Sequence, residues 1–132
     1  MNRRQTHQKE LILKVVGGIG KHLTAEDVLH QVQEIDPSIG LATIYRNLGL
    51  FCKEGKIQKV LRDGICYYDG NPIPHDHFVC VQCGKIEDIH QTYNDSIDEK
   101  VLKSIKGTIL RHSTTYEGYC SKCIKQEEKT WN

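Results

Sequence analysis

Apolar and polar positions alternate with the period of amphipathic helices in three consecutive stretches of the first half of the chain. Apolar side chains three and four residues apart form one stripe, which is the face that a helix buries. Glycines follow the first stretch, Thr24 precedes the second as a good N-cap, and Gly55 follows the third. The three stripes consist of Leu11, Ile12, Val15, Val16 and Ile19; of Val28, Leu29, Val32 and Ile35; and of Ile44, Leu48, Phe51 and Cys52.

Two short runs typical of β-strands follow these helices, at residues 57–61 and 65–68. Asp63-Gly64 lies between them, and an Asp-Gly pair in this position is a strong hairpin signal because both residues tolerate a tight turn. Three helices and a hairpin in so short a segment predict a winged helix-turn-helix domain, whose third helix enters the major groove of DNA.

The polar side of the third predicted helix carries side chains that suit DNA contacts. Arginine pairs with guanine or phosphate, asparagine reads adenine, and a tyrosine ring packs on a thymine methyl group. The alternative is a plain helical bundle whose polar face is only solvated. The candidate DNA-contacting residues are Thr43, Tyr45, Arg46 and Asn47.

The second half of the chain has a mixed pattern after a stretch rich in glycine and proline, which is typical of a linker. Residues 108–116 resemble a strand, and residues 93–105 have helical periodicity. This pattern predicts a small α+β unit, of which the sheet edge or the helix could form a dimer interface.

Two Cys-x-x-Cys pairs lie in this half, with 36 residues between them. Two thiolates at this spacing fit one tetrahedral metal, and two such pairs complete a four-thiolate zinc site. The alternative is that these cysteines form a redox motif or disulfides. The N-terminus does not have the pattern of a signal peptide, so we expect the protein to be cytoplasmic. In the cytoplasm, paired cysteines bind a metal more often than they form a disulfide. The predicted ligands are Cys80, Cys83, Cys120 and Cys123, and the remaining Cys52 and Cys66 are expected to serve as small apolar residues.

A second cluster of candidate ligands surrounds the first cysteine pair. His75 and His77 are two residues apart and would share one face of a strand, so both can hold one metal. Asp69 and Asp88 flank them in sequence. Two imidazoles and two carboxylates suit Fe(II), Mn(II) or Zn(II). The alternative is that these are surface polar residues beside a zinc knuckle.

Composition limits the remaining possibilities. The net charge is +1, so no strong overall field attracts nucleic acid, which favours a dimer that doubles the DNA contacts. Only 38% of the residues are hydrophobic, so a chain of 132 residues needs a metal or a partner subunit to stabilise its core. No apolar run approaches the length of about 20 residues that a membrane span requires.

Together these motifs resemble the ferric uptake regulator (Fur) family of metal-dependent bacterial repressors. The resemblance is carried by residues 41–48 (LATIYRNL), 75–88 (HDHFVCVQCGKIED) and 118–123 (GYCSKC), and it extends from about Thr6 to Cys123. It implies an α+β protein that is not an enzyme, that is cytoplasmic, and that binds double-stranded operator DNA as a homodimer.

The family resemblance also implies a division of the chain and a set of ligands. A winged-helix DNA-binding domain would occupy residues 1–69, a hinge residues 70–74, and a metal-binding dimerisation domain residues 75–132. A structural Zn(II) would bind the four cysteines. A regulatory Fe(II) or Mn(II) would bind His22, Asp69, His75, His77 and Asp88.

The ligand types favour one branch of the family. Iron sensors usually place Glu at the positions of Asp69 and Asp88, and zinc sensors usually place Cys at the first of these. Three histidines and two aspartates resemble the peroxide-responsive (PerR-type) branch, in which bound Fe(II) reduces peroxide and a ligand histidine is oxidised. By position, His22 and His75 are the oxidation candidates.

Two kinds of alternative remain. The first is an iron, manganese or zinc uptake regulator of the same family, without peroxide sensing. The second is a small metallohydrolase that uses a metal-bound water.

The chain departs from the family pattern at several positions. Thr6-His7-Gln8-Lys9 replaces the usual Thr-Pro-Gln-Arg, and about a dozen leading residues are missing, among them most of a helix that often contacts DNA. Gly40 stands where a serine usually caps the third helix, so a cap contact should be lost. Pro74 stands where a further family metal site has a histidine, so that site is not expected, although Asp76, Asp95 and His112 are present.

Overall fold

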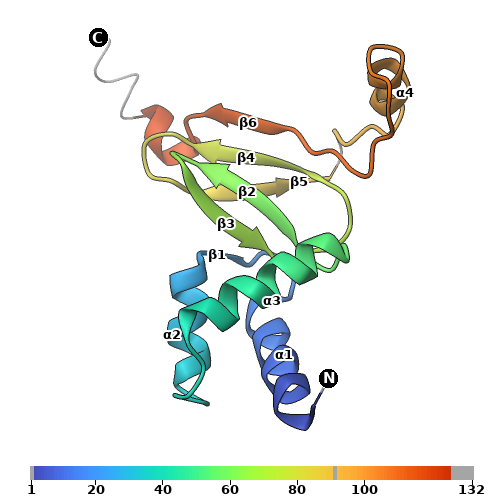
Figure 1. Ribbon diagram of the computed structural model, residues 1–132. Helices are drawn as coiled ribbons and strands as arrows, with labels where there is room; N and C mark the ends of the chain where they lie inside the picture. The colour runs from blue at the N-terminus through green and yellow to red at the C-terminus, as the bar shows by residue number, and fades with distance from the viewer. Residues whose placement is uncertain (1, 91, 126–132) are drawn as a thin grey trace. The chain divides into compact units, whose positions relative to one another are not determined.

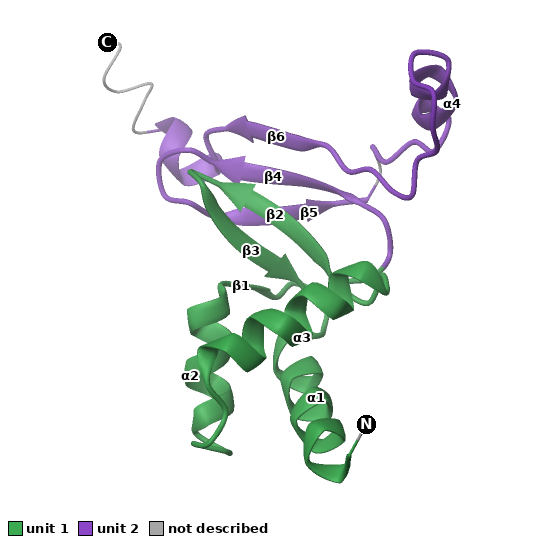
Figure 2. Ribbon diagram, viewed as in Figure 1, with its two compact units in different colours: residues 1–72 green, residues 73–132 purple. Residues whose placement is uncertain are grey.

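The computed structural model describes residues 2–90 and 92–125. It divides the chain into two compact units, Met1–Pro72 (unit 1) and Ile73–Asn132 (unit 2), which Figure 2 shows in different colours. Helices and sheets occur together in the chain, so the predicted α+β class is confirmed.

Unit 1 contains three helices and a small antiparallel sheet (Figure 1). The strand order in the sheet is β1-β3-β2, so the hairpin of β2 and β3 is completed by the short β1. The elements are α1 (Arg3–Val16), β1 (His22–Leu23), α2 (Ala25–Gln33), α3 (Leu41–Lys53), β2 (Gln58–Arg62) and β3 (Ile65–Asp69).

The helix ends follow the capping signals of the sequence. Thr24 caps α2, because its side chain accepts from the backbone N–H of Asp27 while the Asp27 carboxylate accepts from the backbone N–H of Thr24. Gly40 precedes α3 without a side-chain cap, as its replacement of serine predicts. The Asp63-Gly64 turn has positive φ at both residues, which a tight two-residue hairpin requires.

The predicted apolar stripes form the core of unit 1, with two exceptions. Ile19 is 79% exposed and Ile35 is 65% exposed, because α1 ends at Val16 and α2 ends at Gln33, so both isoleucines lie beyond their helices. The core consists of Leu11, Ile12, Val15, Val16, Ala25, Val28, Val32, Ile39, Ile44, Leu48, Phe51, Ile57 and Tyr68.

The first residues of the predicted hinge, 70–74, are packed into unit 1. A Cβ on Gly70 would overlap the carbonyl oxygen of Val16, so only glycine allows the two backbones to approach this closely. Asn71 is buried, and the division between the units follows Pro72.

Among its described residues, unit 2 contains a three-stranded sheet of order β5-β4-β6 and the short helix α4, and residues 121–125 are also helical. β4 pairs antiparallel with β5 and parallel with β6. Figure 1 shows α4 beyond the end of this sheet and not across its face. The elements are β4 (Asp76–Cys80), β5 (Ile86–Ile89), α4 (Ile97–Leu102) and β6 (Thr115–Gly118).

Two predictions for unit 2 were too long. The helical pattern of residues 93–105 forms only the six-residue α4, whose apolar side chains stay exposed and therefore lack a core to extend against. The strand expected at 108–116 begins only at Thr115, the residue that pairs with His77 of β4. None of the described helices is long and apolar enough to cross a membrane.

Candidate metal centres and DNA-facing helix

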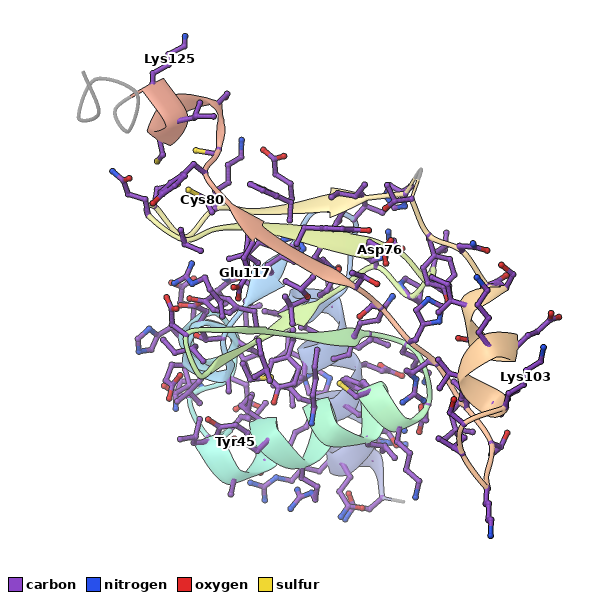
Figure 3. The ribbon with its side chains drawn as sticks, turned by 90° about the horizontal axis from the view of Figure 1, so that it is seen from above. Tyr45, Asp76, Cys80, Lys103, Glu117 and Lys125 are labelled. Carbon is purple, nitrogen blue, oxygen red and sulfur yellow. The ribbon has the colours of Figure 1, made fainter. Side chains whose placement is uncertain are left out.

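The four cysteines of the two Cys-x-x-Cys pairs meet at one end of the sheet in unit 2. The four sulfur atoms all lie within 4.8 Å of one another, and Figure 3 shows sulfur atoms gathered around Cys80. Gly84 allows the tight turn after the first pair, because it has a φ of 81° and donates its N–H to the carbonyl oxygen of Cys80 at 2.9 Å. This grouping suits a tetrahedral thiolate centre.

The surroundings of the sulfurs favour a bound cation. The backbone N–H groups of Cys83 and Cys120 donate to Sγ of Cys80 and lower the pKa of this thiol to about 6. Burial raises the pKa of the Cys123 thiol to about 12. One sulfur is therefore a thiolate at neutral pH, whereas the other becomes one only when a cation compensates its charge.

Three of the predicted regulatory ligands converge in unit 2. His77 pairs with Asp88 across β4 and β5, and Asp88 Oδ1 lies 3.4 Å from His77 Nε2 and 3.1 Å from His75 Nε2. The rings of His75 and His77 have centroids 4.4 Å apart, and both residues are fully buried. They are therefore not surface residues beside the zinc knuckle.

The hydrogen bonds of His75 fix which ring nitrogen can bind a metal. Its Nδ1 lies 2.6 Å from the carbonyl oxygen of Ile73, which can only accept, so Nδ1 donates. In neutral His75, Nε2 then presents a lone pair towards the carboxylate of Asp88. Two acceptors at 3.1 Å are stable only with a proton or a cation between them. A carbonyl partner at the other nitrogen is also the usual way in which proteins orient a metal-binding histidine.

The other two predicted regulatory ligands form a pair in unit 1. His22 of β1 is opposite Asp69 of β3, and His22 Nε2 lies 3.5 Å from Asp69 Oδ2. Asp69 is completely buried, and its other oxygen accepts from the backbone N–H of Asn71 at 2.9 Å. The five predicted regulatory ligands thus form a group of two in unit 1 and a group of three in unit 2.

The candidate DNA-contacting residues lie on α3, opposite its buried face. Tyr45 is 48% exposed and is labelled in Figure 3, while Asn47 donates its side-chain amide to the carbonyl oxygen of Thr43 at 2.9 Å. A hollow of about 470 Å³ lies between Tyr45, the start of α2 and the hairpin. A smaller one of about 250 Å³ is lined by Gln5, Gln8, Arg46, Asn47 and Leu50.

One residue near the unit 2 ligands escaped the sequence prediction. The ring of His90 lies 5.1 Å from that of His75. Its position two residues after Asp88 was the available signal, but His90 follows the end of β5, so strand alternation could not place it.

The side chains of Asp76 and His112 interact with other residues of unit 2. Thr92 and Thr114 donate to the Asp76 carboxylate, and His112 lies beside Asp98 and Tyr93. Among the described residues, the groupings that could hold a metal do not include Asp76, Asp95 or His112.

Comparison with known proteins places the chain in one group of regulators. The model of the ferric uptake regulator family matches residues 1–117. The ferric uptake regulation protein of Bacillus subtilis is 34% identical over 128 residues, which cover 92% of this chain and 86% of that protein. The peroxide operon regulator of the same organism is 28% identical over 125 residues, which cover 94% and 86%.

The solved structures agree with the sequence comparison. The crystal structure of the Campylobacter jejuni peroxide stress regulator matches with a TM-score of 0.74 and 27% identity, and covers 91% of each chain.

Proposed function

Because the chain belongs to the ferric uptake regulator family, we propose that it represses transcription by binding double-stranded operator DNA as a homodimer when Fe(II) or Mn(II) occupies a regulatory site. It is a transcription regulator and not an enzyme, so the metallohydrolase alternative is wrong. The observation that carries the proposal is the grouping of buried His75 and His77 with partly buried Asp88, in which two imidazoles face one carboxylate oxygen.

The proposed regulatory site consists of His22 and Asp69 from unit 1 together with His75, His77 and Asp88 from unit 2. Bound there, Fe(II) or Mn(II) would supply a positive charge that three imidazoles and two carboxylates share. Five ligands drawn from two units can meet in only one relative orientation of those units. Metal binding would therefore shift the population towards that orientation.

This orientation matters for DNA binding because each α3 of the dimer must enter its own half-site. Half-sites are separated by one or more helical turns, so the distance between the two recognition helices decides the affinity. Tyr45, Arg46 and Asn47 on the exposed side of α3 are the proposed base-reading residues, and Thr43 stands beside them.

The apolar surface of unit 2 fits the proposed homodimer. Ile97, Val101, Leu102 and Ile105 are each at least 40% exposed, and β6 forms an edge of its sheet. Exposed apolar side chains and open strand edges are features that protein interfaces cover. The four-cysteine group is proposed to hold a structural Zn(II) that stabilises this unit.

We further propose that the regulator senses peroxide. Relatives named for iron uptake and for peroxide response both match the chain, so the ligand types carry this choice: both carboxylates are aspartates, at positions 69 and 88. With Fe(II) bound, one oxygen of hydrogen peroxide would be inserted into a ring C–H bond of His22 or His75, and the other would leave as water. Loss of that ligand would release the DNA. The alternative is an iron, manganese or zinc uptake regulator without this chemistry.

The test is operator binding by the zinc-loaded protein with Fe(II) or with Mn(II), each before and after peroxide. We expect both metals to support binding, and peroxide to abolish it only with Fe(II). Peptide mass spectrometry should then find one added oxygen on His22 or His75. Binding that needs no metal would refute the regulator mechanism. Binding that survives peroxide in Fe(II), with no oxidised histidine, would leave the uptake-regulator alternative.

A further inference from the structure

Asp76 separates His75 from His77 in sequence, but its side chain has other partners. Consecutive side chains of a strand face opposite sides, so Asp76 leaves β4 on the side away from His77. Its carboxylate is buried, with the residue 2% exposed. Thr92 donates its hydroxyl to Oδ2 at 2.8 Å, and Thr114 donates its backbone N–H to Oδ1 at 2.9 Å.

The two partners of Asp76 stand at the two ends of one excursion of the chain. We name residues 92–114, which include α4, the α4 arm. The backbone N–H of His77 also donates to the carbonyl oxygen of Thr114 at 2.9 Å. Figure 3 labels Asp76 on β4 and Lys103 at the end of α4. One buried carboxylate thus joins both ends of the arm to the start of β4.

A second set of contacts closes the arm just beyond Asp76. The rings of Tyr93 and His112 stack, with centroids 4.7 Å apart and planes 10° apart. Nδ1 of His112 lies 2.5 Å from Oδ1 of Asp98, near the start of α4. These contacts extend the connection from Asp76 to the helix itself.

The position of α4 must depend on such contacts. A helix of six residues is not stable in water by itself. The arm nevertheless carries the exposed apolar side chains of α4, so the contacts at its base determine where this apolar surface is presented.

We propose that Asp76 is a positioning residue that couples metal binding at His75 and His77 to self-association through the α4 arm. The inference rests on the proposed function, which supplies the metal and the dimer. When the two histidines close on a metal, the backbone of β4 moves with them. Asp76 transmits that movement through two hydrogen bonds to both ends of the arm. By linkage, self-association raises metal affinity by the same factor.

The experiment compares two substitutions of Asp76, one that removes its side-chain hydrogen bonds and one that can keep them. Asp76→Ala removes both bonds. Asp76→Asn can keep both, because its amide oxygen accepts from Thr114 and its amide nitrogen donates to the hydroxyl of Thr92, which can also accept. Thr92→Val removes one bond and keeps the branched shape. Glu10→Gln, an exposed carboxylate on α1 in unit 1, is the matched control. The dimer dissociation constant is measured by sedimentation with and without Mn(II), together with zinc content and Mn(II) affinity.

We expect Mn(II) to tighten the wild-type dimer by roughly fivefold or more. Asp76→Ala should keep its zinc and its Mn(II) binding but lose most of this gain. Asp76→Asn and Glu10→Gln should behave as wild type, and Thr92→Val should fall between. Should Asp76→Ala fail to fold, a reduced gain in Thr92→Val supports the proposal and a full gain overturns it.

Three results would overturn the coupling: a full gain in Asp76→Ala, an Asp76→Asn as impaired as Asp76→Ala, or no effect of Mn(II) on the wild-type dimer. Operator binding by the same wild-type preparation separates this failure from that of the proposed function. Mn(II)-dependent operator binding without a change in dimer affinity refutes only the coupling, whereas metal-independent operator binding refutes the proposed function.

Discussion

The backbone N–H of Cys120 donates a hydrogen bond to Sγ of Cys80 across 3.4 Å, which joins two residues that are 40 positions apart. The N–H of Cys83 donates to the same sulfur at 3.5 Å. Both bonds favour the charged form of the sulfur, and together they explain why its pKa falls to about 6. The folded chain thus prepares one thiolate of the proposed zinc site by backbone geometry.

The depressed pKa of Cys80 predicts how zinc retention depends on pH. The folded pKa lies below that of an ordinary thiol near 9, so the stabilisation by this thiolate is complete above pH 9 and is lost as the pH falls through about 6. We expect the zinc affinity to weaken progressively as the pH falls below about 6, because protons then compete with zinc for Sγ of Cys80. Zinc release is followed with a chromogenic chelator. Retention that stays constant far below pH 6 would contradict this role of Cys80.

Replacement of Cys123 tests whether the four-cysteine group is structural. Cys123→Ser should release zinc and unfold unit 2, because this sulfur belongs to a small core of Cys80, Cys120 and Cys123, against which Phe78 packs. Zinc content and circular dichroism measure both effects. Cys66→Ser is the control and should keep its zinc, because Cys66 packs against the core of unit 1. A zinc-loaded, folded Cys123→Ser would show that the group is not structural.

Replacement of Asp88 tests the proposed regulatory ligands of unit 2. Asp88→Ala removes the oxygen that faces both His75 and His77, so Mn(II) affinity should fall by at least about tenfold. Even the loss of a residue that only hydrogen-bonds to a metal ligand lowers metal affinity by about this factor. Mn(II) titration of the zinc-loaded protein measures it. Glu87→Gln is the matched control, since the neighbouring Glu87 pairs with Lys85 at 2.7 Å. Equal Mn(II) affinity in Asp88→Ala and Glu87→Gln would remove Asp88 from the site.

The sequence predicted what depends on local signals. The helices and the hairpin follow from their apolar stripes, capping residues and turn residues. The grouping of the four cysteines follows from the Cys-x-x-Cys spacing, because a tight turn brings the two sulfurs of each pair together. The pairing of His22 with Asp69 could not be read this way, because β1 has only two residues and shows no alternation. The lengths of α4 and β6 depend on which neighbours they find, and that is decided by tertiary packing.

Tyr45 tests the DNA-facing side of α3. Tyr45→Ala should weaken specific operator binding by about 1–3 kcal/mol, because it removes an exposed ring proposed to contact a base, while zinc and Mn(II) content stay unchanged. Tyr45→Phe keeps the ring and should lose less. Fluorescence anisotropy on operator and on scrambled DNA separates specific from general binding. Operator affinity unaffected by Tyr45→Ala would exclude this position from the groove.

His22 tests whether the metal connects the two units. It is the proposed ligand from β1, and it is paired with Asp69 in unit 1, away in sequence from the histidines of unit 2. His22→Ala leaves the four cysteines and the α4 surface untouched, so zinc content and dimerisation should match wild type. Without His22, a metal bound by the unit 2 ligands no longer favours one orientation of the units as strongly, so the gain in operator affinity on adding Mn(II) should be lost. His7→Ala, an exposed histidine of α1, is the control and should keep that gain. The measurement is operator affinity at matched zinc content, with and without Mn(II). A wild-type gain in His22→Ala would mean that metal at the unit 2 ligands acts without unit 1, and the proposed connection between the units would have to be abandoned.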